Sequence, residues 1–442
     1  MKLGSSRRLR FTTIFILVLV ATWASKYAWA KTEIHFWHAM SGHRNDAVEA
    51  LAKRFNDGQN EYEVKPLWKG TYAETLAAAM AAYRAETPPH IVQVFDVGTQ
   101  SMLQSGAIIP VFQLMKDVGI AVNWSDFIQP VLSYYSQDNR LYSMPFNSST
   151  PILYFNKDAF HKAWLNPEKP PTSWREVGEY ARRIVAAGAA QCGFSTGWPS
   201  WILFENMAAW HDLPFATRQN GFGGLDAKLS INGEFQVQLI SQLAAWQAES
   251  IYRYGGRRDI PDPKFVSGEC AMYLQSSALI GGFTRSVPFR WGTAQLPHWG
   301  EPYKRGTSIP GGATLWVMRG LPVTDYRGVA QFLKFVAEPT QQAWWHQATG
   351  YVTITNASLK YLGQTNHFLR NPDQWTAFGQ LTSGHNTPNT QGIRLGNFVA
   401  IRDAIESELE NILAGKVSVK QGLDDAVAKG NEILKEFANL HR

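Results

Sequence analysis

The most reactive-looking pattern in the chain is the segment 193–197, Gly-Phe-Ser-Thr-Gly, which matches the G-x-S-x-G nucleophile elbow of α/β-hydrolases. That elbow holds its serine on a sharp turn between a strand and an immediately following helix. A strand is predicted over 192–196, but Trp198 and Pro199 follow where the helix would have to begin. A pattern with two free positions also arises easily by chance. A secreted hydrolase that uses Ser195 is therefore only a distant alternative.

Other catalytic and metal signatures are weak. His35, His38 and His43 cluster near the N-terminus, but their spacing matches no zinc motif and no carboxylate partner stands out. The sequence contains neither the phosphate loop G-x-x-x-x-G-K-[ST] nor the metalloprotease motif H-E-x-x-H. We therefore expect no catalytic residue, no metal and no cofactor.

What remains is a set of hydrogen-bond donors. Backbone N–H groups, hydroxyls and an arginine fork bind a phosphate monoester well. Ser149, Ser276, Gly312, Tyr351 and Arg402 supply such a set if the fold brings them together. Each of them alone is more often a core or surface residue, so the hypothesis depends on the whole set.

The elements that would position these residues begin with alternating strands and helices. Segments 32–37, 62–68 and 91–95 are predicted strands, with Pro66 placing the second near a sheet edge, and apolar residues at helical spacing separate them. This βαβαβ order predicts a parallel sheet with right-handed crossovers. Ligands of such sheets bind beyond the carboxyl ends of the strands, which is where Tyr72 and Asp96 fall.

A second α/β unit is expected after residue 150. Ser173 and Glu176 form a capping-box pattern before an amphipathic helix. A strand over 270–274 leads to Ser276 and Ser277, which are placed to open a helix whose free N–H groups would attract an anion. Gly311 and Gly312 precede a strand over 313–318 and allow close backbone approach to a ligand. The tail, 397–437, is predicted to form two helices broken around Gly415.

The first thirty residues have the features of a cleavable signal peptide. Basic residues precede an apolar run over 11–24, and Ala-Trp-Ala at 28–30 offers a cleavage site. The run is too short to span a bilayer comfortably, which favours secretion over a permanent anchor. Residues 1–30 contain five of the 42 Lys and Arg and no Asp or Glu, so their removal lowers the formal charge from +6 to +1. We expect no nucleic-acid partner and no stable membrane insertion.

The chain contains two cysteines, Cys192 and Cys270. In an oxidising compartment they could pair, and the chain-entropy argument gives such a link about 4 kcal/mol of stabilisation. Two separately buried thiols fit the sequence equally well.

The donor residues lie within segments that resemble a known family. The segment 146–158, Phe-Asn-Ser-Ser-Thr-Pro-Ile-Leu-Tyr-Phe-Asn-Lys-Asp, is similar to the crossover of the extracytoplasmic solute-binding proteins that serve ABC importers. Further segments narrow the resemblance to the periplasmic glycerol-3-phosphate-binding members, and it extends from residue 34 to the last helix. These segments are 36–40, 69–72, 93–99, 145–154, 193–201 with Glu205 and Asn206, 311–317, 345–351 and 394–397.

The resemblance implies an α/β protein of the type II periplasmic-binding fold, with two lobes that close on ligand. The expected division is 31–145 with 306–350 in the N-terminal lobe and 146–305 with 351–442 in the C-terminal lobe. It also implies a monomer in the periplasm that passes sn-glycerol 3-phosphate to the transmembrane subunits of an ABC permease with a cytoplasmic ATPase. Glycerophosphodiesters such as glycerophosphocholine are expected as second ligands.

The ligand-binding residues implied by the resemblance are eight: Tyr72, Asp96, Ser149, Trp198, Ser276, Gly312, Tyr351 and Arg402. Trp198 is expected against the glycerol moiety and Asp96 at its hydroxyls. The family commonly has Glu where Asp96 stands, so the carboxylate here is one methylene shorter. A binder of neutral sugars is the nearer alternative, because sugar binders dominate the superfamily and the chain is rich in Trp.

Overall fold

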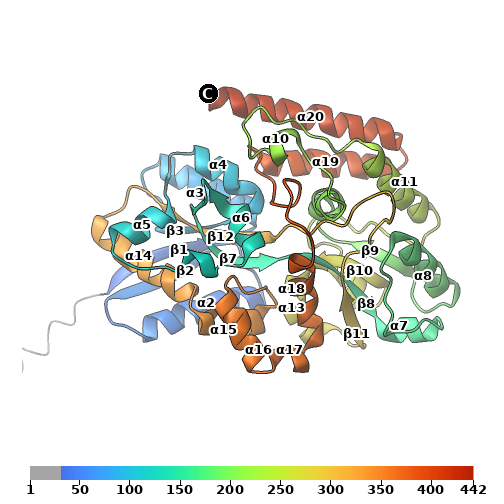
Figure 1. Cartoon of the computed structure of the whole chain (residues 1–442), viewed down its shortest axis with the longest axis horizontal. Coiled ribbons are helices and arrows are strands. Elements are labelled where there is room, and N and C mark those ends of the chain that lie inside the picture. The colour runs from blue at the N-terminus through green and yellow to red at the C-terminus, as the bar shows by residue number, and fades with distance from the viewer. Residues whose placement is uncertain (1–30, 442) are drawn as a thin grey trace, which may run out of the picture.

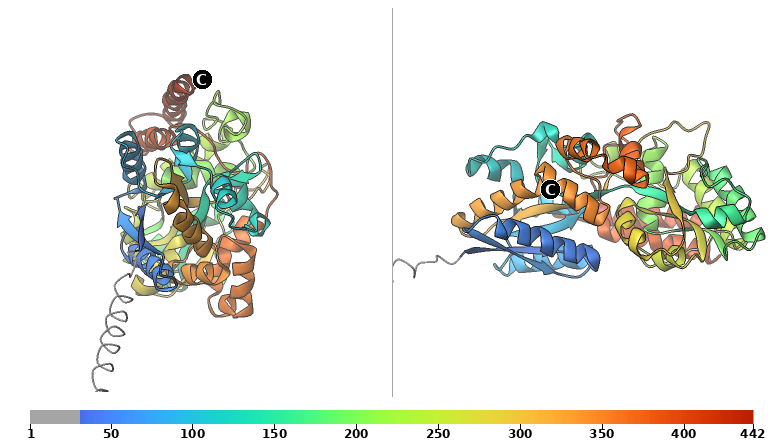
Figure 2. Two further views of the ribbon diagram at one scale, coloured as in Figure 1. Left: turned by 90° about the vertical axis from the view of Figure 1, so that its left-hand side faces the viewer. Right: turned by 90° about the horizontal axis from the view of Figure 1, so that it is seen from below.

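The expected alternation of strands and helices is present from the first described residues. The structure is a computed structural model that describes residues 31–441, and the expected signal peptide lies outside them. Two sheets lie toward opposite ends of the molecule (Figures 1 and 2). The strands between residues 151 and 294 form one sheet, and the strand at 311–318 returns to the sheet that the earlier strands form. We call the parts around the two sheets the N-terminal and the C-terminal lobe.

The sheet of the N-terminal lobe has six strands in the order β2-β1-β3-β12-β4, with β7 also paired to β12. The strands β1, β2 and β3 are mutually parallel, and β12 runs antiparallel to β3. The predicted βαβαβ unit is therefore confirmed, and β2, which contains Pro66, is an edge strand. The bounds are β1 (Thr32–His38), β2 (Tyr62–Trp68), β3 (Ile91–Phe95), β4 (Ile108–Ile109), β7 (Met144–Ser149) and β12 (Gly311–Met318).

The sheet of the C-terminal lobe has four strands in the order β11-β8-β10-β9. Cys192 on β9 lies opposite Cys270 on β10, and the two form a disulfide. The pairing that the sequence left open is thus settled by strand register. The bounds are β8 (Pro151–Asn156), β9 (Cys192–Thr196), β10 (Cys270–Ser276) and β11 (Trp291–Ala294), and a separate hairpin consists of β5 (Ser136–Gln137) and β6 (Arg140–Leu141).

Helices cover both sheets. The capping box at Ser173 and Glu176 is present at the start of α8. The principal helices are α2 (His43–Asp57), α3 (Tyr72–Arg84), α8 (Trp174–Ala186), α11 (Glu234–Ala248), α13 (Ile280–Ser286), α14 (Val323–Val336), α15 (Pro339–Thr349), α16 (Asn356–Gln364), α18 (Trp375–Thr382), α19 (Phe398–Leu413) and α20 (Val419–Leu440). Among residues 31–441, no helix is both long and apolar enough to cross a membrane.

The connection between the lobes is a buried polar seam. The chain leaves β7 at Ser149, passes Thr150 and enters β8 at Pro151. Thr150 Oγ1 donates to Ser308 Oγ at 2.7 Å. Ser308 lies on the connection from β11 to β12, by which the chain returns to the N-terminal lobe. Gln380 Nε2 of α18 donates to Thr150 Oγ1 at 3.0 Å and to the Pro151 carbonyl at 2.6 Å. These bonds tie three passages of the chain together at the place where the lobes meet.

The lobe boundary expected between residues 145 and 146 does not coincide with the residue at which the chain changes from one sheet to the other. Ser149, Ser148 and Asn147 on β7 pair with β12 in the sheet of the N-terminal lobe. The chain changes sheets at Thr150 because the β7 ladder continues to the last residue before it. The second crossing lies within 295–310, between β11 and β12, and so contains the expected boundary at 305.

The two C-terminal helices are those expected on either side of Gly415, and they lie together along one side of the molecule (Figure 1). The helix α19 packs against η1 (Asp96–Gly98) of the N-terminal lobe and against the π-helical segment η3 (Ser200–Asn206) of the C-terminal lobe. A residue on α19 can therefore contact both lobes at once.

Candidate ligand-binding site

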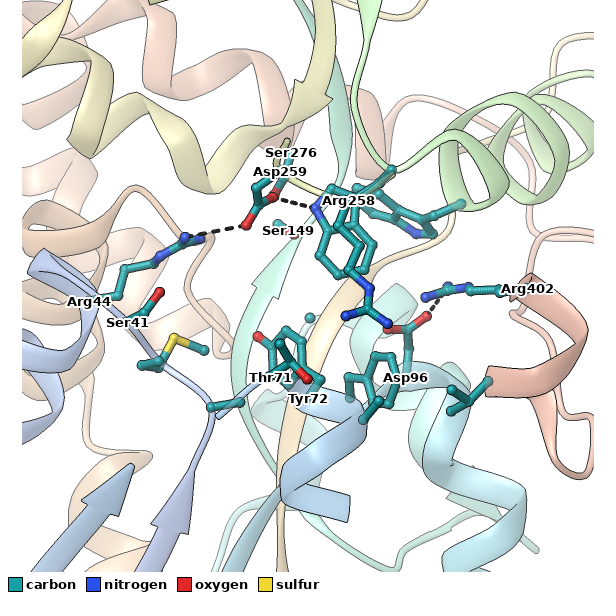
Figure 3. Close-up of a pocket in the computed structure, with 18 of the residues that line it drawn as sticks. Ser41, Arg44, Thr71, Tyr72, Asp96, Ser149, Arg258, Asp259, Ser276 and Arg402 are labelled. Carbon is teal, nitrogen blue, oxygen red and sulfur yellow. Dashed lines mark hydrogen bonds and ion pairs between the residues drawn. The ribbon is translucent and has the colours of Figure 1, made fainter. Parts of the chain in front are cut away.

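A cavity of about 410 Å³ lies where the two lobes meet (Figure 3). All eight residues expected from the sequence line it, although they are spread from residue 72 to residue 402. They are Tyr72, Asp96, Ser149, Trp198, Ser276, Gly312, Tyr351 and Arg402. Their convergence in one cavity is a property of the fold, because they come from eight different elements or connections in both lobes.

Three of these residues are held by strand pairing at the seam. Ser149 is the last residue of β7 and pairs with Gly311 of β12, next to Gly312. Ser276 is the last residue of β10 and pairs with Pro151 of β8. Because Thr150 alone separates Ser149 from Pro151, the two ladders bring the serine hydroxyls and the start of β12 to one edge of the cavity.

Gly312 has a backbone conformation that excludes larger residues. Its φ is +106°, and a Cβ there would lie 1.9 Å from the Asn147 carbonyl oxygen. Glycine adopts this conformation without a steric penalty and leaves its backbone open to the cavity. The structure therefore requires glycine at the second position of the Gly311-Gly312 pair.

Tyr72 is oriented by a chain of hydrogen bonds. Ala39 N–H donates to Gln93 Oε1 at 2.8 Å, Gln93 Nε2 donates to Asn147 Oδ1 at 2.7 Å, and Asn147 Nδ2 donates to the Tyr72 hydroxyl at 2.9 Å. The Tyr72 ring also stacks on Phe95, with centroids 5.1 Å apart. The hydroxyl oxygen accepts this bond, and the hydroxyl also has a side-chain hydrogen bond with Tyr351. Burial raises the Tyr72 pKa well above its ordinary value, so the hydroxyl stays protonated.

Trp198 lies on the C-terminal-lobe side of the cavity and is also anchored. Its backbone has φ +40°, and its Nε1–H donates to Asp259 Oδ1 at 2.5 Å. The indole is partly buried and packs against the core, with Trp201 beside it in the cavity lining. A held indole forms a flat apolar wall for a small ligand.

Arg402 is expected to offer its donors to a phosphate, but in the structure these donors are already bonded to protein carboxylates. Its Nε and Nη2 donate to the two carboxylate oxygens of Glu205, each at 2.7 Å, and Nη2 also donates to Asp96 Oδ2 at 2.5 Å. All three side chains are buried. Asp96 belongs to the N-terminal lobe and Glu205 to the C-terminal lobe, so Arg402 on α19 joins the lobes through charge-assisted bonds.

The carboxylates around Arg402 have raised pKa values. Burial, reinforced by the charge of Glu205 and opposed by Arg402, raises the Asp96 pKa to about 6. Burial raises the pKa of Glu406, one turn further along α19, to about 7. The carboxyl oxygens of Asp96 and Glu406 line this end of the cavity and are suited to accept hydrogen bonds from ligand hydroxyls.

Six further charged residues at the site have no place in the sequence-based set: Arg44, Glu205, Arg258, Asp259, Asp403 and Glu406. Five of them line the cavity, and Glu205 pairs with Arg402 behind it. Glu205 and Asn206 belong to a segment that carried the resemblance, which is the signal that could have indicated Glu205. Arg44 follows the helix start and Asp259 lies in a loop, where no periodic pattern marks them.

The alternative chemical hypotheses find no support in the geometry. Ser195 lies within β9 rather than on an elbow, is fully buried, and donates its hydroxyl to the Arg253 carbonyl at 2.7 Å. The hydrolase hypothesis is therefore wrong about this serine. No group of three or more His, Cys, Asp or Glu within residues 31–441 is arranged to hold a metal ion, and burial lowers the His38 pKa to about 4.

Comparison with known families gives a direct match. Residues 50–376 fit the model of the bacterial extracellular solute-binding proteins. The chain belongs to this family. Over 416 residues, this solute-binding protein is 42% identical to the sn-glycerol-3-phosphate-binding periplasmic protein UgpB of Salmonella typhimurium, covering 93% of this chain and 94% of that protein. It is also 42% identical over 413 residues to UgpB of Escherichia coli K12, with coverage of 93% and 94%.

Solved structures show the same fold for this solute-binding protein. UgpB of Mycobacterium tuberculosis, in complex with glycerophosphocholine, superposes with a TM-score of 0.79 at 23% identity and covers 92% of this chain and 99% of that chain. The GacH receptor of Streptomyces glaucescens, solved unliganded and with acarbose, has a TM-score of 0.77 at 16% identity, with coverage of 92% and 99%. The expected two-lobed type II periplasmic-binding fold is confirmed.

Proposed function

We propose that this chain is the periplasmic solute-binding component of an ABC importer that captures sn-glycerol 3-phosphate, with glycerophosphodiesters such as glycerophosphocholine as second ligands. It acts as a monomer without catalysis and delivers its ligand to the transmembrane subunits of a permease driven by a cytoplasmic ATPase. The observation that carries the proposal is the convergence of eight expected donor, acceptor and wall residues on one cavity between two lobes.

The chemistry of the lining supports a ligand with two different ends. Hydroxyls of Ser149, Ser276, Tyr72 and Tyr351, with the backbone of Gly312, line one part of the cavity and suit phosphate oxygens. Asp96 and Arg402, with Glu406 behind, line another part and suit the hydroxyl groups of glycerol. Trp198 supplies the apolar wall beside them.

The size of the cavity supports the inclusion of diesters. Its volume of about 410 Å³ lies in the range of pockets that enclose drug-sized ligands. Glycerol 3-phosphate is smaller than such ligands, and the second alcohol of a diester would use the remaining space. Trp68 and Ile260, which line the cavity and are largely exposed, offer apolar surface for that group at the mouth.

Ligand capture requires that the lobes close on the bound molecule, which drives closure through its greater affinity for the closed form. We place the lobe division at Thr150 and within 295–310, where the buried hydrogen bonds of Gln380 and Ser308 hold the crossing strands. The Arg402 bonds to Asp96 and Glu205 support this account, because they join the lobes across the cavity.

Calorimetric titration of the ligand-stripped mature protein tests the proposal. We expect saturable binding of sn-glycerol 3-phosphate and of glycerophosphocholine, and no heat of binding with maltose. The three tryptophans in the lining, Trp68, Trp198 and Trp201, favour a neutral sugar as the second candidate. Binding of maltose alone would overturn the proposed ligand and support that candidate.

A further inference from the structure

Three arginines line the cavity, Arg44, Arg258 and Arg402, and Arg44 lies on the side opposite Arg402 (Figure 3). It lies in the first turn of α2, on the N-terminal lobe, and points across the cavity toward Asp259 of the C-terminal lobe. Its side chain is 19% exposed. It therefore places a mostly desolvated positive charge on this side of the cavity.

The hydrogen bonds of the two arginines differ sharply. Arg402 has short bonds from Nε and Nη2 to two carboxylates. Arg44 has its nearest carboxylate oxygen, Asp259 Oδ2, at 3.7 Å from Nη2, which is beyond hydrogen-bond length. Within residues 31–441, no acceptor lies within reach of its buried Nε.

A buried guanidinium with unused donors favours an anion. A charge removed from water costs free energy unless it is paired and hydrogen-bonded. Asp259 supplies only a long ion pair, and its other oxygen accepts from Trp198 Nε1. Burial lowers the Arg44 pKa, but interactions with Tyr351, Asp259 and Tyr72, including a side-chain hydrogen bond with Tyr351, outweigh burial and raise that pKa.

The distribution of charged side chains along the cavity also favours an anion beside Arg44. At the Arg402 end, Arg402 is bonded to Asp96 and Glu205, with Glu406 on the same helix, and Arg258 also lines the cavity. Glu406 also has a distant contact to Arg257, at 3.8 Å. At the Arg44 end, Asp259 lies at a longer distance from the guanidinium, and Asp262 interacts with it electrostatically. The Arg44 guanidinium is therefore less neutralised by direct carboxylate bonds than that of Arg402, which favours an anion beside it.

We propose that Arg44 is a specificity-determining residue that binds the phosphoryl group and favours dianionic phosphate monoesters over monoanionic diesters. This inference rests on the proposed function and deepens it. An arginine fork gains most from a phosphate with several free terminal oxygens, and a monoester has one more of these than a diester. Arg44 also fixes the orientation of the ligand, with phosphate toward α2 and the glycerol hydroxyls toward Arg402.

The test is calorimetric titration of the mature protein and its Arg44→Gln variant with sn-glycerol 3-phosphate and with glycerophosphocholine. Charge-assisted bonds of this kind correspond to a loss of about ten- to a hundredfold in affinity for the monoester. We expect a clearly smaller loss for the diester, so that the preference shifts toward it. Arg54→Gln is the matched control, because Arg54 lies on the same helix but on the exposed surface against Trp344.

The pH dependence supplies a second readout. The second ionisation of a phosphate monoester lies near pH 6, so monoester affinity of the wild type should rise between pH 5 and pH 7. That rise should be reduced in Arg44→Gln and unchanged in Arg54→Gln. Arg44→Lys keeps the charge but loses the fork, and we expect an intermediate monoester affinity.

The outcomes separate the two proposals. If the wild type binds neither phosphate ligand, the proposed function is wrong. If the wild type binds both and Arg44→Gln keeps the affinity ratio of the wild type, the role of Arg44 is wrong while the proposed function stands. If Arg44→Gln fails to fold, Arg44→Lys decides the matter, because a wild-type preference in that variant would overturn the requirement for the guanidinium fork.

Discussion

Replacement of Arg402 with methionine tests the charge cluster at the centre of the cavity. The substitution keeps an unbranched apolar side chain on α19 and removes three charge-assisted bonds, two to Glu205 and one to Asp96. The side chains of Asp96 and Glu205 are 6% and 0% exposed, so water cannot replace the lost cation. Breaking a buried pair in this way costs about 3–5 kcal/mol, and we expect a loss of that size in the free energy of unfolding at pH 7.5.

The cost should depend on pH in a definite direction. The folded-state pKa of Asp96 is raised to about 6, above the unfolded value of about 3.9, and loss of Arg402 removes the interaction that lowers it. An acid with a raised folded pKa holds its proton more tightly in the folded state, so its penalty is full at high pH and fades as the pH falls through the raised pKa. We expect the deficit of Arg402→Met to be about 1–2 kcal/mol smaller at pH 5 than at pH 7.5.

The assay is urea unfolding of the mature protein at both pH values, with the disulfide intact. The triple variant Asp96→Asn, Glu205→Gln, Arg402→Met is the control, because its cluster is neutral and it should recover part of the lost stability. A deficit below about 1 kcal/mol at pH 7.5, or one of equal size at both pH values, would refute the reasoning. Calorimetry on the same variants should show weaker binding of glycerol 3-phosphate, since glycerol would lose its oriented acceptors.

Three further changes test other parts of the structure. Trp198→Ala should weaken glycerophosphocholine binding about tenfold or more by calorimetry, because the apolar wall is lost, and unchanged affinity would contradict that role. Gly312→Ala should lower the free energy of unfolding by more than about 2 kcal/mol, because the new Cβ meets the Asn147 carbonyl at a positive φ; a variant as stable as wild type in urea would refute the steric argument. Replacement of both Cys192 and Cys270 with Ala should lower the free energy of unfolding by about 2–4 kcal/mol, and two reactive thiols in the denatured wild type would show that the disulfide does not form.

Much of the N-terminal lobe could be predicted from local patterns. The strands β1, β2 and β3 follow from short apolar segments separated by residues at helical spacing, and β2 as an edge strand follows from Pro66. The helix start at Ser173 follows from a local capping box, which depends on residues only three positions apart. The change of sheet at Thr150 does not follow from local patterns, because the pairing of β7 depends on β12, which is distant in the sequence.

The residues of the site also divide into those that local sequence indicates and those that depend on residues distant in the sequence. Ser149, Ser276 and Gly312 could be selected because each stands at a strand end or start and within a segment that resembles a known family. The disulfide could not be decided, because Cys192 and Cys270 are 78 positions apart and only the register of β9 with β10 places them opposite each other.

The sequence by itself indicated the class of the protein and the eight residues that the structure places in the cavity lining, because short motifs specify residue types at the ends of strands and helices. Only the tertiary structure decided how charge is distributed among them. Arg402 is paired with Asp96 and Glu205, which are 306 and 197 positions away, whereas the buried Nε of Arg44 has no hydrogen-bond partner among the described residues. The state of a buried charge depends on which oxygens lie within about 3 Å and on the loss of water around it, and local sequence contains neither.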